Sequence, residues 1–328
     1  MRWQNPPMSS SPVSGSVPSR QLVVRLCNMV GDVVLGLPAL QLLQQHGYQL
    51  NLYGKRWAAD LLAGHGWACT ARGASWSERV AQLRQMRDRC GVLDASFGGR
   101  INTLLMPNSF SSALEARWAG LKPAGYARDG RSLLLKQAWP RTQPEHALEG
   151  FWGLACRLTG QDLPPPDRIE LNVTAPAQER ADQLLAAHGV QPGFICIVPY
   201  AAGDVEGQDK RWPDFPALTR ALPRFGRQII TCPGPGEEQI ARELHPDAIS
   251  LPNLGLGEYL GVLKRASLVI SNDTGPAHMA AAVGTRVLSV LGPTKPEQWR
   301  PWGPQNCIVQ STQTLWPSVD DVLQKVAS

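Results

Sequence analysis

The chain has 328 residues, of which 43% are hydrophobic and 18% charged, and its formal net charge is +5. This length exceeds that of most single domains, so we expect two domains. The small positive charge is scattered along the chain, which excludes a nucleic-acid-binding arm and leaves acidic small substrates or an anionic surface as partners. Seven cysteines without a C-x-x-C pair indicate reduced thiols in a cytoplasmic protein.

Residues 1–20 are rich in Ser, Pro and Gly, and we expect them to form a disordered arm without a secretory signal or membrane span. From Gln21, the apolar run QLVVRLCN predicts a strand, and MVGDVVLGLPALQLLQQHG predicts a helix. Further runs, including QLNLYG and GVLDASFGG, are interpreted as part of the same alternation. The pattern predicts a parallel sheet covered by helices over residues 21–175.

A change of composition around PPPDRIELNVTAP marks a boundary between two domains. The alternation then resumes over residues 176–312, from FICIVPY through RQIITCPG and SLVISND to RVLSVLG. The sequence therefore predicts an α/β protein with two doubly wound, Rossmann-like domains. We expect residues 313–328 to form a C-terminal helix that packs back on the N-terminal domain.

The segment most informative about function is SLVISNDTGPAHMAAAVGTRVLSVLG, residues 267–292, in which an apolar strand runs into an Ala-rich helix. Ligands of doubly wound sheets bind where the carboxyl end of a strand meets a helix N-terminus, and the N–H groups there attract phosphate. Asp273, Thr274, Gly275 and Pro276 are therefore candidate phosphate-site residues, and His278 lies one turn into the helix. The alternative is that Asp273 or Thr274 only caps the helix.

Two further segments of this half carry charged residues after predicted strands. In PYAAGDVEGQDKRWP, the ammonium of Lys210 could contact a diphosphate, and the alternative is a solvated surface lysine. In IITCPGPGEEQIARE, Gly234 and Gly236 form G-x-G, but the third glycine of a dinucleotide fingerprint is missing. Glu237 and Glu238 could hold ribose hydroxyls, or they could serve only as first-turn partners of a helix dipole.

In the N-terminal half, RLCNMVGDVVLGLPAL places Gly31 and Asp32 at a strand-to-helix turn. The Asp32 carboxylate is a candidate general base for a substrate hydroxyl, and the alternative is a helix N-cap. A cleft between two such domains would bring this carboxylate opposite the phosphate site of the other half.

Other polar residues of this half are candidate contacts for an anionic acceptor. Asn108 and Ser109 stand at the end of another predicted strand in LMPNSFSSALEARWAG. Arg128 and Arg131 follow in YARDGRSLLLK, for which the alternative is a solvated basic loop.

Several motifs are absent from the sequence. It contains no D-x-D pair that would hold a metal against a diphosphate, no H-E-x-x-H, no G-x-S-x-G and no P-loop. We therefore predict no metal site, and we expect a departing diphosphate to be stabilised by helix N-termini and cations.

GDVVLGLPAL, LMPNSFSSALEARWAG, DKRWP and SNDTGPAHMAAAVGTRVLSVLGPTKPEQWRPWG occur together and in this order. This set resembles the lipopolysaccharide core heptosyltransferases of glycosyltransferase family 9 over about residues 21–310. The resemblance implies a GT-B fold, with an acceptor-binding domain at 21–175 and a nucleotide-sugar-binding domain at 176–312. It also implies metal-independent, inverting transfer of heptose from ADP-heptose to an anionic lipopolysaccharide inner-core glycolipid.

By motif position, the resemblance implies Asp32 as base, Lys210 as phosphate contact and Glu237 or Glu238 as ribose contact. Residues 273–275 would form the pyrophosphate cradle, and His278 would line the nucleotide site. No cofactor is implied beyond the nucleotide sugar as substrate. A membrane-bound acceptor implies peripheral contact with the cytoplasmic face of the inner membrane.

Three alternatives remain open at the level of sequence. One is an enzyme of the same fold that uses another nucleotide sugar. Another is a non-catalytic nucleotide-sugar-binding protein, which would not need the carboxylate of Asp32. The third is a nicotinamide-dependent oxidoreductase, which the incomplete G-x-G at residues 234–236 disfavours.

Overall fold

A computed structural model describes residues 20–141 and 146–327. The predicted disordered arm, apart from Arg20, lies outside the described residues. Within them, twelve strands form two parallel sheets of six, with the strand orders β3-β2-β1-β4-β5-β6 and β11-β10-β7-β12-β13-β14. Numbered within its own half, each sheet has the order 3-2-1-4-5-6, which defines the doubly wound fold. Both sheets confirm the predicted α/β class.

The strands of the first sheet are β1 (Arg20–Arg25), β2 (Tyr48–Gly54), β3 (Ala68–Ala71), β4 (Thr103–Leu105), β5 (Pro123–Tyr126) and β6 (Gln137–Trp139). Those of the second are β7 (Ile195–Val198), β10 (Ile229–Thr231), β11 (Ile249–Ser250), β12 (Leu268–Ser271), β13 (Val287–Leu291) and β14 (Cys307–Gln310). A short antiparallel hairpin, β8 (Asp204–Val205) and β9 (Gln208–Asp209), stands outside both sheets.

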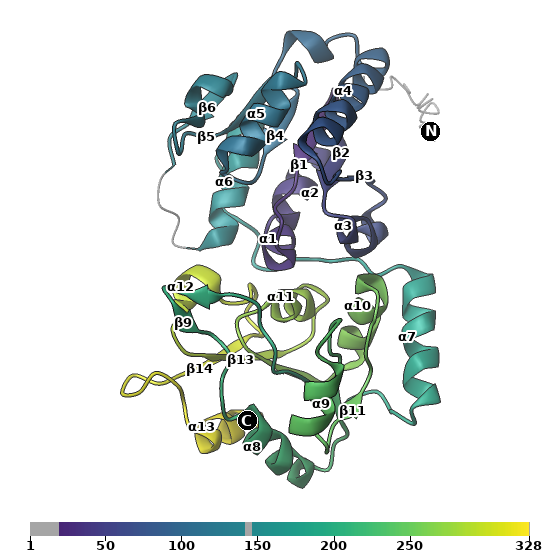
Figure 1. Ribbon diagram of the computed structural model, residues 1–328, viewed down its shortest axis with the longest axis vertical. Helices are drawn as coiled ribbons and strands as arrows, with labels where there is room; N and C mark the ends of the chain where they lie inside the picture. Colours follow the sequence, from purple (N-terminus) through teal and green to yellow (C-terminus); the bar gives the residue numbers. More distant parts are fainter. Residues whose placement is uncertain (1–19, 142–145, 328) are drawn as a thin grey trace, which may run out of the picture.

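The helices of the N-terminal half are α1 (Val30–Leu35), α2 (Leu37–Gln45), α3 (Trp57–Leu61), α4 (Trp76–Leu93), α5 (Phe110–Trp118) and α6 (Ala147–Thr159). Those that follow are α7 (Ala175–Ala187), α8 (Phe215–Ala221), α9 (Glu238–Leu244), α10 (Leu256–Arg265), α11 (Gly275–Ala282), α12 (Pro296–Trp299) and α13 (Val319–Ala327). Figure 1 shows the two halves one above the other, with α1 and α11 facing each other between them.

The strands bury both faces, as covered parallel sheets do. In β1, Leu22 and Val24 pack with residues of α1 and α2, whereas Val23 packs with α4 and α5 on the opposite face. Helix α6 packs on α2, and α7 packs on α10, so the chain passes from one half to the other between them. None of the described helices combines the length and the apolar character that a bilayer crossing requires.

Two expectations are wrong in detail. Helix α13 packs on α8, β13 and β14 of the second half, where Val322, Leu323 and Val326 join the cluster around Trp212, and not on the N-terminal domain. The run GVLDASFGG is not a strand, because its first residues end helix α4. A Ser75–Glu78 capping box starts that helix.

Candidate active site in the cleft between the domains

The two sheets place their strand ends at the same cleft. In each sheet the strand order reverses between two neighbours, β1 and β4 in one and β7 and β12 in the other. Ligands bind beyond the carboxyl ends of strands at such a reversal. Helix α1 follows β1, α11 follows β12, and the two helices pack against each other across the domain boundary. The cleft therefore combines the binding edges of both sheets.

A cavity of about 520 Å³ opens there, lined by residues of both halves. Its lining residues are Met29, Val30, Gly31, Asp32, Leu35, Asp204, Val205, Lys210, Asp273, Thr274, Gly275, Pro276, His278 and Trp299. The structure thus brings together seven of the predicted binding residues and the predicted base. We call this space the interdomain cavity.

Asp32 does not cap its helix. Helix α1 begins after Met29, which occupies the N-cap position, so Asp32 is the third residue of the first turn. Burial, together with the negative charge of Asp273, raises the pKa of Asp32 from 3.8 to about 6. A carboxylate with a pKa near the working pH is suited to proton removal. The N-cap alternative for Asp32 is therefore wrong.

Asp273 lies opposite Asp32 and is held by two partners. The ammonium Nζ of Lys210 is 3.8 Å from Asp273 Oδ2, and the hydroxyl of Thr294 donates to the same oxygen at 3.1 Å. Burial raises the pKa of Asp273, and Lys210 and Thr294 oppose that rise. The helix begins at Gly275 with Thr274 as N-cap and no side-chain cap bond, so Asp273 does not cap it. Its carboxylate instead fixes Lys210 in the cavity.

The first turn of α11 offers backbone donors to the cavity. Pro276 has no N–H, and the N–H of Ala277 is bonded to the carbonyl of Thr274. The N–H of Gly275 remains one of the unsatisfied donors of a helix start. Together with Lys210, it gives this wall of the cavity the character of an anion site.

Two glycines permit the close approach of α1 and α11. A Cβ atom on Gly31 would come within 2.9 Å of Cδ2 of His278, and one on Gly275 within 3.1 Å of Cβ of Val30. His278 is buried, and burial, with the charges of His146 and Lys210, lowers its pKa to about 3. His278 is therefore neutral at pH 7 and contributes no positive charge to the cavity.

Gly31→Ala should lower turnover at least tenfold, because the added methyl pushes α1 away from His278 and displaces Asp32. The matched control is Gly91→Ala in α4, where an added Cβ meets nothing within 4 Å. It should keep full activity and gain up to about 1 kcal/mol of stability from helix propensity. Steady-state kinetics of both variants provide the measurement. Equal turnover in the Gly31 variant would show that this approach is not needed for activity.

A second cavity of about 280 Å³ adjoins the first and shares Thr274 and Pro276 with it. We call it the nucleoside cavity. Glu237 lines it, and its Oε2 accepts the N–H of Gly234 at 2.9 Å, which leaves Oε1 for another donor. Glu238 lines neither cavity, and its Oε2 accepts the N–H of Gly236. Of the two glutamates, the structure therefore places only Glu237 where a ribose contact is possible.

Of the predicted substrate-binding residues, Gly31 lines the interdomain cavity and the other four lie outside it. Arg131 is fully buried, and its donors bind carbonyl groups of Tyr126 and Pro107 and the side chain of Asn108. Arg131 and Asn108 thus stabilise the loop after β4, and the interpretation of Arg131 as an acceptor contact is wrong. Ser109 caps α5, and Arg128 is exposed, 3.6 Å from the carboxylate of Asp129.

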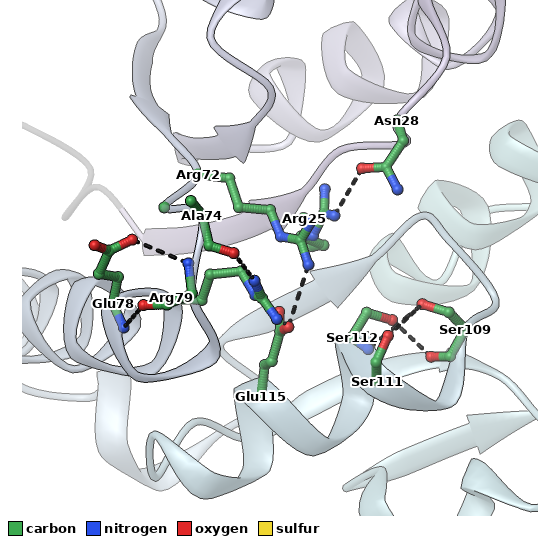
Figure 2. A network of polar contacts seen from close by, with 12 residues as sticks. Arg25, Asn28, Arg72, Ala74, Glu78, Arg79, Ser109, Ser111, Ser112 and Glu115 are labelled. Atoms are coloured by element: carbon green, nitrogen blue, oxygen red, sulfur yellow. Dashed lines mark hydrogen bonds and ion pairs between the residues drawn. The ribbon is translucent and has the colours of Figure 1, made fainter.

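Different arginines occupy the carboxyl edge of the N-terminal sheet. Figure 2 shows Arg25, Arg72 and Arg79 gathered around Glu115, with Asn28 beside Arg25. Glu115 is buried, and its Oε1 lies 3.2 Å from Arg72 Nη2 and 2.6 Å from Arg79 Nε. Burial and the charge of Arg72 lower the pKa of Arg25 to about 10. These four charged residues form the arginine cluster, whose formal net charge is positive.

Sequence reasoning also missed residues that hold the cleft together. Asn272 is fully buried; it donates to the carbonyl of Pro199 and accepts the N–H of Trp212. It thereby joins the end of β12 to the end of β7 and to the chain just after Lys210. Both Asn272 and Thr294 follow predicted strands, so their position at strand ends was an available signal.

Two doubly wound halves that share one interdomain cleft form a GT-B fold. The family model for Glycosyltransferase family 9 (heptosyltransferase) matches residues 102–326, more than half of the sequence. The chain belongs to this family.

Curated relatives and solved structures agree with that assignment. Lipopolysaccharide heptosyltransferase 1 of Salmonella typhimurium is 29% identical over 306 residues, or 84% of this chain and 89% of that protein. Lipopolysaccharide heptosyltransferase 3 of Escherichia coli K12 is 32% identical over 126 residues. This match spans 36% of this chain and 36% of that protein. The structure of E. coli ADP-heptose lps heptosyltransferase II has a TM-score of 0.77 at 19% identity and covers 94% of this chain and 97% of that one.

Proposed function

We propose that this chain transfers heptose from ADP-heptose to a lipopolysaccharide inner-core acceptor, with inversion at the anomeric carbon and without a metal ion. The observation that carries the proposal is the pairing, in one cavity, of Asp32 with the Lys210 and Gly275 wall. The names of the relatives support the choice of donor and acceptor. One solved neighbour, E. coli heptosyltransferase WaaC with ADP-2-deoxy-2-fluoro heptose, was determined with such a nucleotide sugar.

In the proposed reaction, Asp32 removes the proton of the acceptor hydroxyl while that oxygen bonds to the anomeric carbon. The bond from this carbon to the diphosphate oxygen breaks, and the departing ADP carries the electron pair. Asp32 comes from the N-terminal half and the anion-binding wall from the C-terminal half. The acceptor oxygen would therefore approach the anomeric carbon from the side opposite the departing diphosphate. This is the geometry of inversion in a single displacement.

The leaving diphosphate would be stabilised by Lys210 and the N–H of Gly275. Asp273 is a poor direct partner for a diphosphate, because two anions repel each other. We assign it instead to positioning, since it holds Lys210 through the 3.8 Å ion pair. Glu237, in the nucleoside cavity, would accept hydrogen bonds from the ribose.

The arginine cluster supports an anionic acceptor. Arg25 is 4% exposed; its side chain donates to the Leu26 carbonyl and to Asn28, and the nearby carboxylate of Glu115 is already paired with Arg72 and Arg79. Buried charges are normally paired, so an anionic group of the acceptor would complete this site. Because such an acceptor is a glycolipid, the proposal includes peripheral contact with the cytoplasmic face of the inner membrane.

The test is an assay of purified chain with ADP-heptose and a heptose-deficient inner-core acceptor, with and without its anionic groups. We expect product of inverted anomeric configuration by NMR, at a rate that excess EDTA leaves unchanged. Removal of the anionic groups should raise the acceptor KM at least tenfold. Loss of activity in EDTA would contradict the metal-independent mechanism, and release of ADP without a sugar product would contradict transfer.

A further inference from the structure

Two tyrosine hydroxyl groups in the nucleoside cavity lack hydrogen-bond partners. Tyr259, on α10, is 7% exposed, and Tyr200 is the second residue after β7. Both residues line the cavity, and the hydroxyl oxygen of each is buried without a hydrogen-bond partner among the described residues. A buried polar group without a partner destabilises a protein, so such groups are normally satisfied. The residues that line this cavity therefore include two tyrosines whose hydroxyl groups lack the partner that a buried polar group normally has.

The remaining walls suit a flat heterocycle. Val198, Cys232, Leu254 and Leu256 provide apolar surface, and Thr274 and Pro276 form the edge shared with the anion-binding wall. A nucleotide with its diphosphate at that shared edge would extend its nucleoside into this cavity. Binding sites of this kind combine apolar walls with a few polar groups that fix orientation.

The position of Tyr259 points to the base end of the nucleoside. Tyr259 lines the cavity, and its buried hydroxyl lies near Cys196, Cys232 and Glu237, which together with burial raise its pKa well above the usual value. Glu237 already offers a carboxylate oxygen for the ribose. With the ribose bound by Glu237, the Tyr259 hydroxyl would hydrogen-bond to the polar edge of the nucleobase.

We propose that the hydroxyl groups of Tyr200 and Tyr259 read the nucleobase of the donor by hydrogen bonding to its polar edge. This inference rests on the proposed function, because it assumes that the nucleoside cavity holds a nucleotide. It adds that base selection depends on two phenols, one after β7 and one within α10. Loss of a hydrogen bond from a buried recognition group costs selectivity as well as affinity.

The test is calorimetric titration of ADP, UDP and GDP into the wild-type chain and into Tyr259→Phe. We expect the variant to bind the preferred nucleotide about tenfold more weakly and to lose most of the preference among the three bases. Without nucleotide, its Tm should stay equal or rise by about 2 °C, because an unsatisfied hydroxyl is removed. A purely structural tyrosine would not combine weaker binding with unchanged or higher stability.

Tyr126→Phe is the matched control, because the Tyr126 hydroxyl donates to the carbonyl of Gly150 at 2.7 Å in the other half. It should lower Tm and leave all three affinities unchanged. Affinities that are unchanged in Tyr259→Phe, or reduced by one factor for all bases, would overturn the inference. Turnover is measured separately: binding through Tyr259 without sugar transfer would contradict the proposed function and leave the inference standing.

Discussion

Asp32→Asn should lower kcat by about 10³-fold, while the affinity for nucleotide changes by less than about threefold. General base catalysis contributes roughly 10²- to 10⁴-fold, and an amide cannot accept the proton of the acceptor hydroxyl. Asp32 lines the interdomain cavity opposite the anion-binding wall, so its replacement leaves the nucleotide contacts in place. Steady-state kinetics and calorimetry with ADP measure the two effects separately.

The pH dependence follows from the raised pKa of Asp32. With a pKa of about 6, the carboxylate is roughly nine-tenths ionised at pH 7, and kcat/KM should fall tenfold per pH unit below pH 6. Bound donor brings further negative charge, so the acid limb of kcat should lie at higher pH than that of kcat/KM. A rate independent of pH between 5 and 7 would remove Asp32 as the base.

The same substitution should stabilise the protein at neutral pH. A folded-state pKa of about 6, against an ordinary value of 3.8, means that stability is lost as pH rises from about 4 through 6. Asn carries no charge, so Asp32→Asn should recover up to about 3 kcal/mol at pH 7 and none below pH 4. The control is Asp88→Asn on α4, where the exposed carboxylate pairs with Arg87; this substitution should change neither activity nor stability by much.

Lys210→Met should lower kcat by about 10²- to 10³-fold and weaken nucleotide binding about tenfold. Methionine keeps most of the side-chain volume but removes the charge that would stabilise the departing diphosphate. Lys210 is half-buried and paired with Asp273, so its ammonium is fixed in the cavity before substrate binds. Without it, the pKa of Asp273 should rise further, because the attraction that opposes burial is lost.

Lys264→Met is the matched control, because Lys264 is exposed on α10 and lines a different cavity. It should keep wild-type kcat and nucleotide affinity. A Lys210 variant with the kinetics of this control would show that the leaving group is stabilised elsewhere. Partial recovery in Lys210→Arg would instead confirm that a positive charge at this position is what matters.

The positions of the motifs after predicted strands correctly identified many of the residues that line the cleft. Asp32, Lys210 and the 273–276 segment follow strands of two doubly wound sheets, and the carboxyl ends of such strands converge on one edge. Spacing alone could not separate a base from an N-cap at Asp32. The structure resolves that point because Met29 occupies the N-cap position and Asp32 lines the cavity.

The environments of several side chains depend on contacts between residues that are far apart in the sequence. An arginine can be buried among carbonyl groups, as Arg131 is, or beside a second arginine, as Arg25 is beside Arg72. Which of the two occurs depends on the loops that pack around it. Tyr259 carries no sequence signal, because a tyrosine within an amphipathic helix is ordinarily a core residue. Helix α13 likewise has an apolar stripe that specifies burial but not the surface that buries it.

The sequence by itself determined the alternation of strands and helices, the two-domain α/β class and the segments that reach the cleft. These depend on local hydrophobic periodicity and on turn chemistry. Only the tertiary structure decided that Asp273 holds Lys210, that His278 occupies the space a side chain at Gly31 would need, and which arginines gather around Glu115. The physical reason is that distance, burial and charge pairing between residues far apart in the chain arise from packing, which no local pattern records.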